Sequence, residues 1–287
     1  MSENDETVGK LVGDYLTDQI TVILDAEPAL RDRGPVIHDT RVACRRLRST
    51  LRTYPKVVDA SRAAALNEEL VWFAGLLGAV RDLEVLEERL LADLAELPAE
   101  LVVGPVAAQI QRELTVRRSA AWAAVIEVLD TSRYRQLVAE LHRWRSDPPF
   151  TKKATAPATK VKSYVKRADK KLTRRLHRGI EAQLAGDPGA DVLLHSARKA
   201  GKRARYAAEL ATPVLGEKAE AIIAGRKDLQ DVLGEHQDSI VTGAFLRSEG
   251  VRLGIRSGHN GFTYGLLYGR ELARQAMIGE QLQPFLN

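Results

Sequence analysis

The sequence predicts an all-α protein built by internal duplication of an antiparallel helical bundle, and three observations lead to this prediction. Apolar residues recur at steps of three and four through most of the chain, without the alternation that is typical of strands. A composition of 45% hydrophobic but only 5% aromatic residues favours helices over sheet. Finally, two cationic segments repeat one pattern at a fixed distance along the chain.

The repeated pattern is HDTRVACRRLR at residues 38–48 and HSARKAGKRAR at residues 195–205, an offset of 157. In both copies a histidine is followed by a basic residue at positions +3, +7, +8 and +10, while the apolar residues differ. A second matched pair, LGAVRD at 77–82 and LGEHQD at 233–238, lies at an offset of 156. The loss of one residue between the two pairs is what a change of loop length between duplicated halves would leave.

Five helices are expected in the first half of the chain, at residues 8–23, 35–54, 59–97, 99–129 and 133–145. Pro28 and Gly34 follow the first helix, and Pro35 is well placed at the start of the second. Thr131 or Ser132 is available to cap the last helix.

A linker is expected next, because residues 146–159 combine three prolines with Thr, Ala and Lys. We therefore predict a first bundle over residues 1–148, a linker over 149–159 and a second bundle over 160–287. The expected helices of the second bundle are 161–184, 190–211, 217–248 and 261–282.

Each cationic segment is predicted to present two separate faces of one helix. At about 100° per residue, His38, Arg41, Arg45, Arg48 and Arg52 fall within roughly 80° of arc. An apolar seam lies on another face and consists of Thr40, Cys44, Leu47, Leu51 and Tyr54. In the second copy the seam is small, with Ala197, Gly201, Ala204, Ala208 and Ala211, which predicts close packing against a neighbouring helix. Its stripe is weaker, because Glu209 stands where Arg52 stands in the first copy.

A cation on every helical turn over roughly 21 Å suits a polyanion with regularly spaced phosphates. The helix after the linker adds further cations, since residues 151–178 hold eleven Lys and Arg against one acid. Rows of this kind are often only solvated faces, but here the charges are repeated while the seam changes, which favours phosphate binding. The candidate phosphate-binding residues are His38, Arg41, Arg45, Arg46, Arg48, Arg52, Lys160, Arg167, Lys171, Arg174, His195, Arg198, Lys199, Lys202, Arg203 and Arg205.

Two pairs of titratable residues leave alternatives open. His38 and His195 either contact the ligand or make capping and carboxylate contacts within the protein. Asp82 and Asp238 are expected to orient an Arg or His of the cationic helices, although paired carboxylates also suit a divalent cation. No phosphate loop, HExxH or CxxC motif is present, so no catalytic site, cofactor or metal is predicted.

The compartment is predicted from cysteine usage and hydropathy. Cys44 is the only cysteine, so no disulfide can form within the chain, and a cytoplasmic location fits best. The longest apolar run, near residues 70–80, is too short to span a bilayer, and the acidic N-terminus does not resemble a signal peptide. We therefore expect neither secretion nor membrane insertion. Trp72, Trp122 and Trp144 fall at apolar positions and are expected in the core rather than in base stacking.

The doubled His-x-x-Arg-x-x-x-[RK]-Arg-x-Arg helix followed by LGxxxD resembles the CHAD family, the conserved histidine α-helical domain. The segments TSRYRQLVAELHRW (131–144) and GFTYGLLYGRELA (261–273) are also similar to late helices of that family. The resemblance implies two four-helix bundles related by pseudo-twofold symmetry, with the basic helices facing a shared groove or pore that binds inorganic polyphosphate. It implies that the residues of both cationic motifs are ligands. Arg81 is matched only by Gln237, an asymmetry that the pattern does not explain.

Three functions are compatible with these features. The first is non-enzymatic binding of inorganic polyphosphate, in a protein that is cytoplasmic or associated with storage granules. Family members are often fused to a triphosphate-tunnel (CYTH) domain, which this chain lacks, so we expect it to act alone or to recruit a polyphosphate-metabolising enzyme. The second is a nucleic-acid or granule-surface scaffold that uses the same cations. The third is a metal-assisted phosphohydrolase that uses Asp82 and Asp238.

Overall fold

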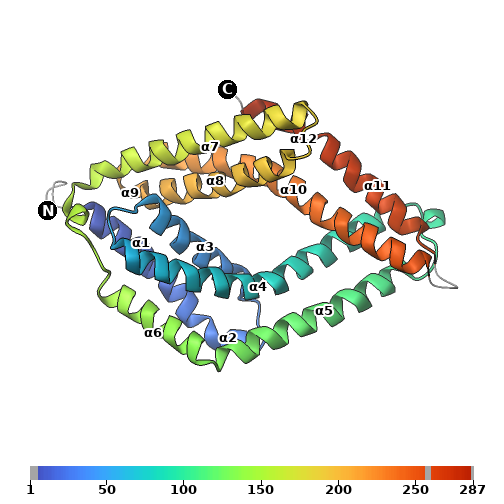
Figure 1. Ribbon diagram of the computed structural model, residues 1–287, viewed down its shortest axis with the longest axis horizontal. Coiled ribbons are helices and arrows are strands. Elements are labelled where there is room, and N and C mark those ends of the chain that lie inside the picture. Colours follow the sequence, from blue (N-terminus) through green and yellow to red (C-terminus); the bar gives the residue numbers. More distant parts are fainter. Residues whose placement is uncertain (1–5, 256–259, 286–287) are drawn as a thin grey trace.

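All regular secondary structure is helical in the structure, a computed structural model that describes residues 6–255 and 260–285 (Figure 1). The β contacts among these residues are two isolated bridges, Thr7 with Pro157 and Val58 with Phe150. The all-α prediction is confirmed.

The first half of the chain forms six α-helices, which are the five predicted ones in order and one short helix, Glu27–Arg31, that was not predicted. They are α1 (Val8–Asp25), α2 (Glu27–Arg31), α3 (Ile37–Thr53), α4 (Ala60–Ala95), α5 (Val106–Leu129) and α6 (Ser132–Ser146), with a short 3₁₀ turn, η1, at Ala99–Leu101. The side chains of Thr7, Asp59 and Thr131 cap α1, α4 and α6 by accepting hydrogen bonds from backbone N–H groups of the first turn. The helix expected from residue 99 begins only at Val106, because Gly104 takes a positive φ of 85° and Pro105 follows it.

The second half forms six more α-helices within the described residues. They are α7 (Val161–Leu184), α8 (Ala190–Leu210), α9 (Thr212–Leu215), α10 (Glu217–Gly254), α11 (Phe262–Ala276) and α12 (Ile278–Leu282). The 3₁₀ turns η2 (Lys152–Thr155) and η3 (Ala158–Lys160) precede them, and η4 (Gln283–Phe285) follows. The structure differs from the prediction in three places. The short helix α9 was not predicted, α10 continues to Gly254, and the expected last helix is divided after Ala276.

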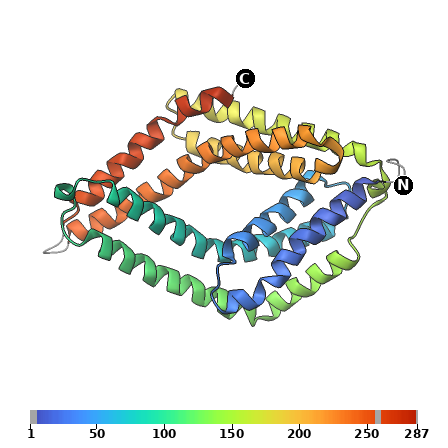
Figure 2. The same ribbon diagram turned by 180° about the vertical axis from the view of Figure 1, so that it is seen from behind.

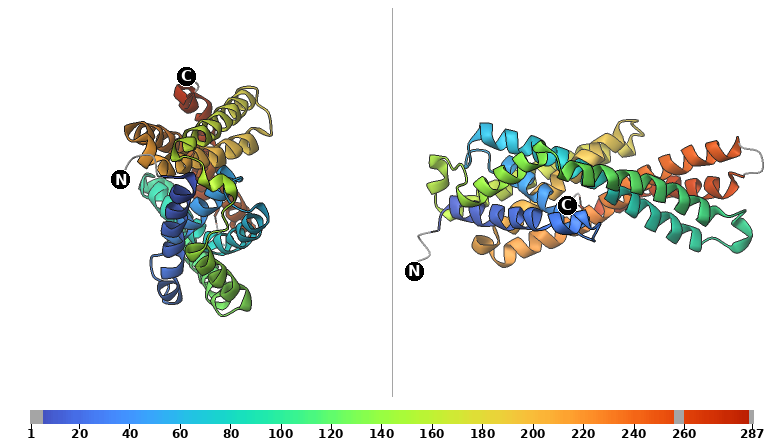
Figure 3. Two further views of the ribbon diagram at one scale, coloured as in Figure 1. Left: turned by 90° about the vertical axis from the view of Figure 1, so that its left-hand side faces the viewer. Right: turned by 90° about the horizontal axis from the view of Figure 1, so that it is seen from below.

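The two longest helices, α4 and α10, organise the molecule. Each starts beside its own group of helices, α1, α3 and α6 for α4, and α7, α8 and α12 for α10 (Figures 1 and 2). The two helices then converge, so that the α4–α5 and α10–α11 hairpins extend side by side from one end of the molecule (Figure 3). The helices α3 and α8, which carry the cationic segments, lie next to each other where the two groups meet.

The buried apolar residues form three clusters, and two of them combine both halves of the chain. The first cluster is centred on α1, α3, α4 and α6 and also takes in the start of α7 and the end of α8. The second joins the far ends of α4 and α10 with α5 and α11. The third is formed by α7, α8, α10 and α12. Two cores are shared across residue 148, so the division into two bundles with a boundary there stays a prediction. The internal duplication also stays a prediction.

The segment expected to be a linker is fixed against the first half. Ala154 and Ala158 are buried. The backbone N–H of Val8 donates to the Ala156 carbonyl (2.9 Å), and the N–H of Ala158 donates to the Glu6 carbonyl (2.8 Å). A Cβ on Gly9 would lie 2.8 Å from the Ala154 Cβ, so only glycine allows this approach.

One helix in the described part of the chain, α4, is long and apolar enough to cross a membrane by length and composition alone. In the structure 44% of its most apolar 18-residue window is buried inside the protein. Leu66, Leu70, Phe73 and Leu77, each at most 2% exposed, belong to the first cluster. Packing in this core accounts for the apolar composition of α4.

Candidate functional site

The cationic faces of α3 and α8 line a cavity of about 580 Å³, which we call the central cavity. The apolar seams predicted for both helices are buried, and Cys44 and Ala208 are both 0% exposed. Because each seam is fixed in the core, the opposite stripe of each helix faces the cavity. Helices α4 and α10 complete its walls with Arg81, Asp82, Gln237 and Asp238.

The central cavity carries a strong excess of positive charge. Nine Lys and Arg side chains and two histidines line it, against only two carboxylates. Of the nine, only Arg41 and Arg81 have a carboxylate partner within 4.0 Å among the described residues. The cations without such a partner are Arg45, Arg48, Arg52, Arg198, Lys199, Lys202 and Arg203.

The LGxxxD motif holds the first arginine of the α3 stripe. Arg41 Nη1 donates to Asp82 Oδ1 at 2.8 Å, and Gly78, one turn before Asp82, leaves room for the guanidinium. A Cβ at Gly78 would lie 3.2 Å from Arg41 Nη2 and 3.4 Å from its Cζ. The motif therefore combines a small residue with a carboxylate on one face of α4, at a spacing that a helix brings together.

The equivalent motif on α10 surrounds Arg198 more loosely. A Cβ at Gly234 would lie 3.9 Å from Arg198 Nη2, and Asp238 acts on Arg198 through its charge without an ion pair within 4.0 Å. Burial raises the pKa of the Asp238 carboxyl, while Arg198 opposes that shift. The predicted orienting role is thus confirmed by direct contact for Asp82.

Several buried nitrogen atoms in the central cavity have no hydrogen-bond partner. They are Arg45 Nε, Arg198 Nε and Arg203 Nη2. A buried donor without an acceptor costs about 1–3 kcal/mol, and more when it is charged. These arginines therefore have unused donor capacity beside the cavity.

Two titratable groups in the central cavity have lowered pKa values because they are buried among positive charges. Burial, together with Arg198, Arg45 and Arg41, lowers the pKa of Lys202 to about 7. Burial and the neighbouring Lys199 also lower the pKa of His195. The Nδ1 atom of His195 lies 2.5 Å from Gln237 Oε1, within hydrogen-bond distance.

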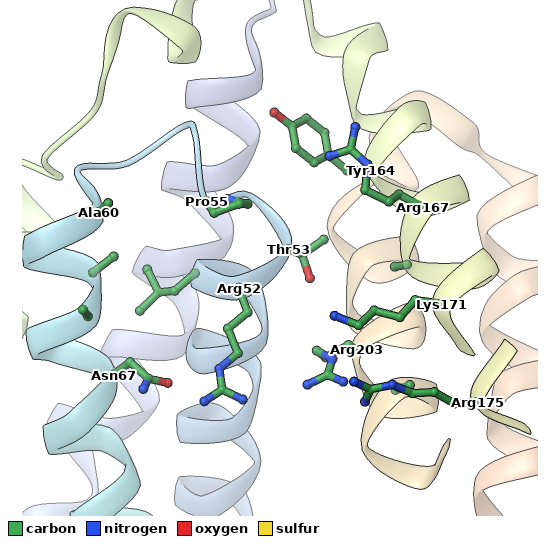
Figure 4. Close-up of a pocket in the computed structure, with 15 residues that line it drawn as sticks. Arg52, Thr53, Pro55, Ala60, Asn67, Tyr164, Arg167, Lys171, Arg175 and Arg203 are labelled. Atoms are coloured by element: carbon green, nitrogen blue, oxygen red, sulfur yellow. The ribbon is translucent and has the colours of Figure 1, made fainter. Parts of the chain in front are cut away.

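A second cavity of about 660 Å³, the side cavity, adjoins the first and shares Arg52 and Arg203 with it. Arg52 from α3, Arg203 from α8, and Lys171 and Arg175 from α7 point toward one another there (Figure 4). No carboxylate lines this cavity among the described residues. Burial, with Arg175 and Arg203, lowers the pKa of Lys171.

The CHAD domain family matches residues 14–247, which is most of the chain and includes both cationic helices. The chain belongs to the CHAD domain family.

Two curated relatives of this CHAD chain come from Mycobacterium tuberculosis. The uncharacterized proteins Rv2226 of strain H37Rv and MT2285 of strain CDC 1551 are each 31% identical to it over 279 residues. The match covers 94% of this chain and 51% of each relative. The chain therefore spans about half the length of the curated relatives it matches.

Two solved structures resemble this one. PptA from Streptomyces chartreusis superimposes with a TM-score of 0.79 at 20% identity, covering 97% of this chain and 99% of PptA. The CHAD domain from the plant Ricinus communis superimposes with a TM-score of 0.71 at 25% identity, covering 96% of this chain and 88% of that domain. Both likenesses support the CHAD fold.

Twelve of the sixteen predicted site residues line one of the two cavities of the CHAD fold. The central cavity takes His38, Arg41, Arg45, Arg48, Arg52, His195, Arg198, Lys199, Lys202 and Arg203, and the side cavity adds Arg167 and Lys171. Lys160 and Arg174 are exposed and lie outside both linings.

Arg46 and Arg205 lie outside the cavities because Glu209 holds them. Arg46 Nε lies 2.9 Å and Arg205 Nε 3.2 Å from carboxylate oxygens of Glu209, which also accepts a hydrogen bond from the Tyr15 hydroxyl. Both guanidinium groups also lie over the Tyr206 ring, at 5.5 and 5.2 Å from its centroid. The substitution of Glu209 for a cation, visible in the sequence, therefore removes two arginines from the set that faces the cavities.

Several lining residues were not among the predicted ones. Arg175 follows Arg167 and Lys171 at steps of four, and this spacing was a usable signal for one helix face. Arg81 and Gln237 line the central cavity at equivalent motif positions. Asn67 reaches the side cavity from α4, and Arg48 Nε donates to its Oδ1 at 3.4 Å. No sequence pattern marks Asn67, because its position depends on how α3 packs on α4.

The paired aspartates differ in their contacts. Asp82 is engaged by Arg41, whereas Asp238 has no ion pair within 4.0 Å among the described residues. No cluster of three or more His, Cys, Asp or Glu side chains suited to a metal occurs within the described residues.

Proposed function

We propose that this CHAD chain binds inorganic polyphosphate in the central cavity, as a non-enzymatic module. The observation that carries this proposal is the set of cations from α3 and α8 that face one cavity without carboxylate partners. Polyphosphate is an unbranched chain of charged phosphates, so each added unit meets another cation, and the contacts strengthen one another through multivalency. A polyphosphate-metabolising enzyme is the proposed partner.

The first test is calorimetric titration with long-chain polyphosphate, short oligophosphate and duplex DNA at two salt concentrations. We expect tight binding that increases with chain length and weakens steeply with salt, because phosphate contacts release condensed counterions. Equal or stronger binding of DNA would instead favour a nucleic-acid scaffold. Release of orthophosphate in the presence of magnesium would contradict the non-enzymatic assignment.

The second test removes four cavity cations together, by substituting Arg41, Arg45, Arg198 and Lys202 with Gln. We expect at least about a 100-fold loss of affinity for long polyphosphate, since hydrogen bonds to charged groups contribute about 1.5–3 kcal/mol each. Helicity should be unchanged, as measured by circular dichroism.

The matched control removes the same charge from an exposed face of α7. Lys162, Lys166, Lys170 and Arg178 are exposed and line neither cavity, and we substitute all four with Gln. A similar loss of affinity in both variants would show that net charge, rather than the cavity, determines binding.

A further inference from the structure

The side cavity has two chemically different walls. One wall is apolar and consists of Leu51, Pro55, Ala60, Ala63 and Ala64, from the end of α3 and the start of α4. The ring of Tyr164 contributes a further surface from α7. It packs on the Tyr54 ring at a centroid distance of 4.7 Å, and the Arg167 guanidinium lies 5.5 Å from its centroid. An inorganic phosphate chain has nothing to place against such surfaces.

The opposite wall is cationic. Arg167, Lys171, Arg175 and Arg203 line it, and Arg52 faces them from α3. None of the five has a carboxylate within 4.0 Å in the described part of the chain. Arg52, Arg203, Lys171 and Arg175 gather at one end of the cavity, whereas Arg167 lies beside Tyr164 (Figure 4). That end adjoins the central cavity, because Arg52 and Arg203 line both. Arg203 Nη2 is buried there without a hydrogen-bond partner. This end of the cavity offers several unused donors to an anion.

A ligand that fits both walls joins a polyphosphate group to a flat, weakly polar ring. We propose that the side cavity binds a nucleoside polyphosphate, with its phosphates at Arg52, Lys171, Arg175 and Arg203 and its base between the α4 alanines and Tyr164. The cavity volume of about 660 Å³ lies within the range of about 300–1,000 Å³ that is usual for small-molecule sites.

This ligand class goes beyond the polyphosphate proposed for the central cavity. Because Arg52 and Arg203 line both cavities, the nucleotide phosphates and a long polyphosphate would compete for these two side chains. We therefore expect saturating nucleotide to weaken polyphosphate binding only partly, since the remaining cations of the central cavity stay available.

The first experiment compares ATP, inorganic tripolyphosphate and adenosine by calorimetric titration of the full chain without magnesium. ATP should bind roughly 5- to 100-fold more tightly than tripolyphosphate, in line with the contribution of base stacking in other proteins. Adenosine alone should bind weakly. Equal affinities for ATP and tripolyphosphate would overturn the proposal, because the base would then contribute nothing.

The second experiment fills the apolar wall. Ala64 and Ala65 are both exposed on α4, but only Ala64 lines the side cavity, so Ala64→Trp is the test and Ala65→Trp is its matched control. An exposed position tolerates a larger side chain without overpacking the core. We expect Ala64→Trp to reduce ATP affinity at least about fivefold and Ala65→Trp to leave it unchanged. Equal ATP affinity in the two variants would contradict the proposal.

A third measurement reports the position of the base directly. Saturation-transfer NMR on ATP should show strong transfer to the adenine H2 and H8 protons in the wild-type protein and in Ala65→Trp, and weak transfer in Ala64→Trp. Strong transfer that persists in Ala64→Trp would place the base elsewhere. These experiments contain no long polyphosphate, so failure here and failure of the central-cavity proposal are separate outcomes.

Discussion

Lys202 shows what the gathering of cations in the central cavity costs the folded protein. Its ammonium group is half-buried on α8, and every charge that acts on it most strongly is positive: Arg198, Arg45, Arg41 and Arg205. The pKa near 7 means that folding disfavours the proton that the unfolded chain keeps up to about pH 10.4. The cavity is therefore less stable without an anion than with one.

The stability of the unliganded protein should rise with pH. The unfolded chain binds more protons than the folded protein between the folded pKa of about 7 and the unfolded pKa of about 10.4, so stability increases across this window. Lys202→Met removes the titration, and we expect it to stabilise the unliganded protein by on the order of 2–4 kcal/mol at pH 7, with the gain disappearing toward pH 10. Urea unfolding at several pH values measures both trends. A gain that does not depend on pH would contradict this account.

Binding of polyphosphate should in turn take up a proton, because an anion restores the charge of Lys202. Calorimetry at pH 8 in buffers of different ionisation enthalpy should show uptake of about half a proton or more per bound chain. His195, whose pKa is also lowered, titrates at lower pH and contributes little there. Lys202→Met should lose most of the uptake, and unchanged uptake would assign it to another group.

At the scale of the element, α3 and α8 are helices with one face in the core and one in the cavity. Their seams differ in size, and α8 also packs closely on α7, where a Cβ at Gly179 would lie 2.8 Å from Leu194 Cδ2. The α4 segment that faces α3 likewise has one exposed and one buried face, with a glycine on each. Gly75 is exposed with nothing within 4 Å of a Cβ, whereas Gly78 is buried against the Arg41 guanidinium.

These two glycines make a matched pair of substitutions. Gly75→Ala should stabilise α4 by about 0.5–1 kcal/mol, because alanine has the higher helix propensity and no neighbour obstructs it. Gly78→Ala should gain less, because the new methyl displaces Arg41 from its hydrogen bond to Asp82. We expect polyphosphate affinity to fall severalfold in Gly78→Ala only, measured by calorimetry. Equal behaviour of the two variants would show that Gly78 does not position Arg41.

At the scale of the whole molecule, an ion-pair network joins the last third of α4 with the middle of α10 and the second half of α11. Arg89 on α4 donates to Glu235 on α10 and Glu271 on α11, each at 2.7 Å, and Arg274 binds both Glu271 and Asp93. Glu271 is 0% exposed and Asp93 is 5% exposed. The network involves three of the helices that form the second apolar cluster, and both connect the two halves of the chain.

Removal of one partner from this network should be costly. Arg89→Ala leaves the buried Glu271 with Arg274 as its remaining cation, and we expect a loss of about 3 kcal/mol in the free energy of unfolding. Lys10→Ala, which breaks the exposed pair with Asp14 on α1, is the control and should change stability little. Urea unfolding followed by circular dichroism measures both, and equal small effects would mean that the network does not stabilise the joined helices.

The sequence by itself determined the helices and the two faces of the cationic segments. Proline, glycine and capping residues gave the limits of α3, α4, α6 and α7 to within two residues, because these signals act within one turn of the chain. The buried seams of α3 and α8 followed from helical periodicity in the same way. The candidate stripes also followed, since residues three and four apart share a helix face.

The tertiary structure alone decided which cations face an anion and which are used internally. Arg46 and Arg45 are neighbours in the sequence with the same charge, but Glu209 holds Arg46 from another helix, while Arg45 Nε is buried without a partner. The lining of the side cavity and the shared cores likewise combine segments about 100 or more residues apart. Local periodicity carries no information about such distant pairs, because their free energies depend on how the helices pack against one another.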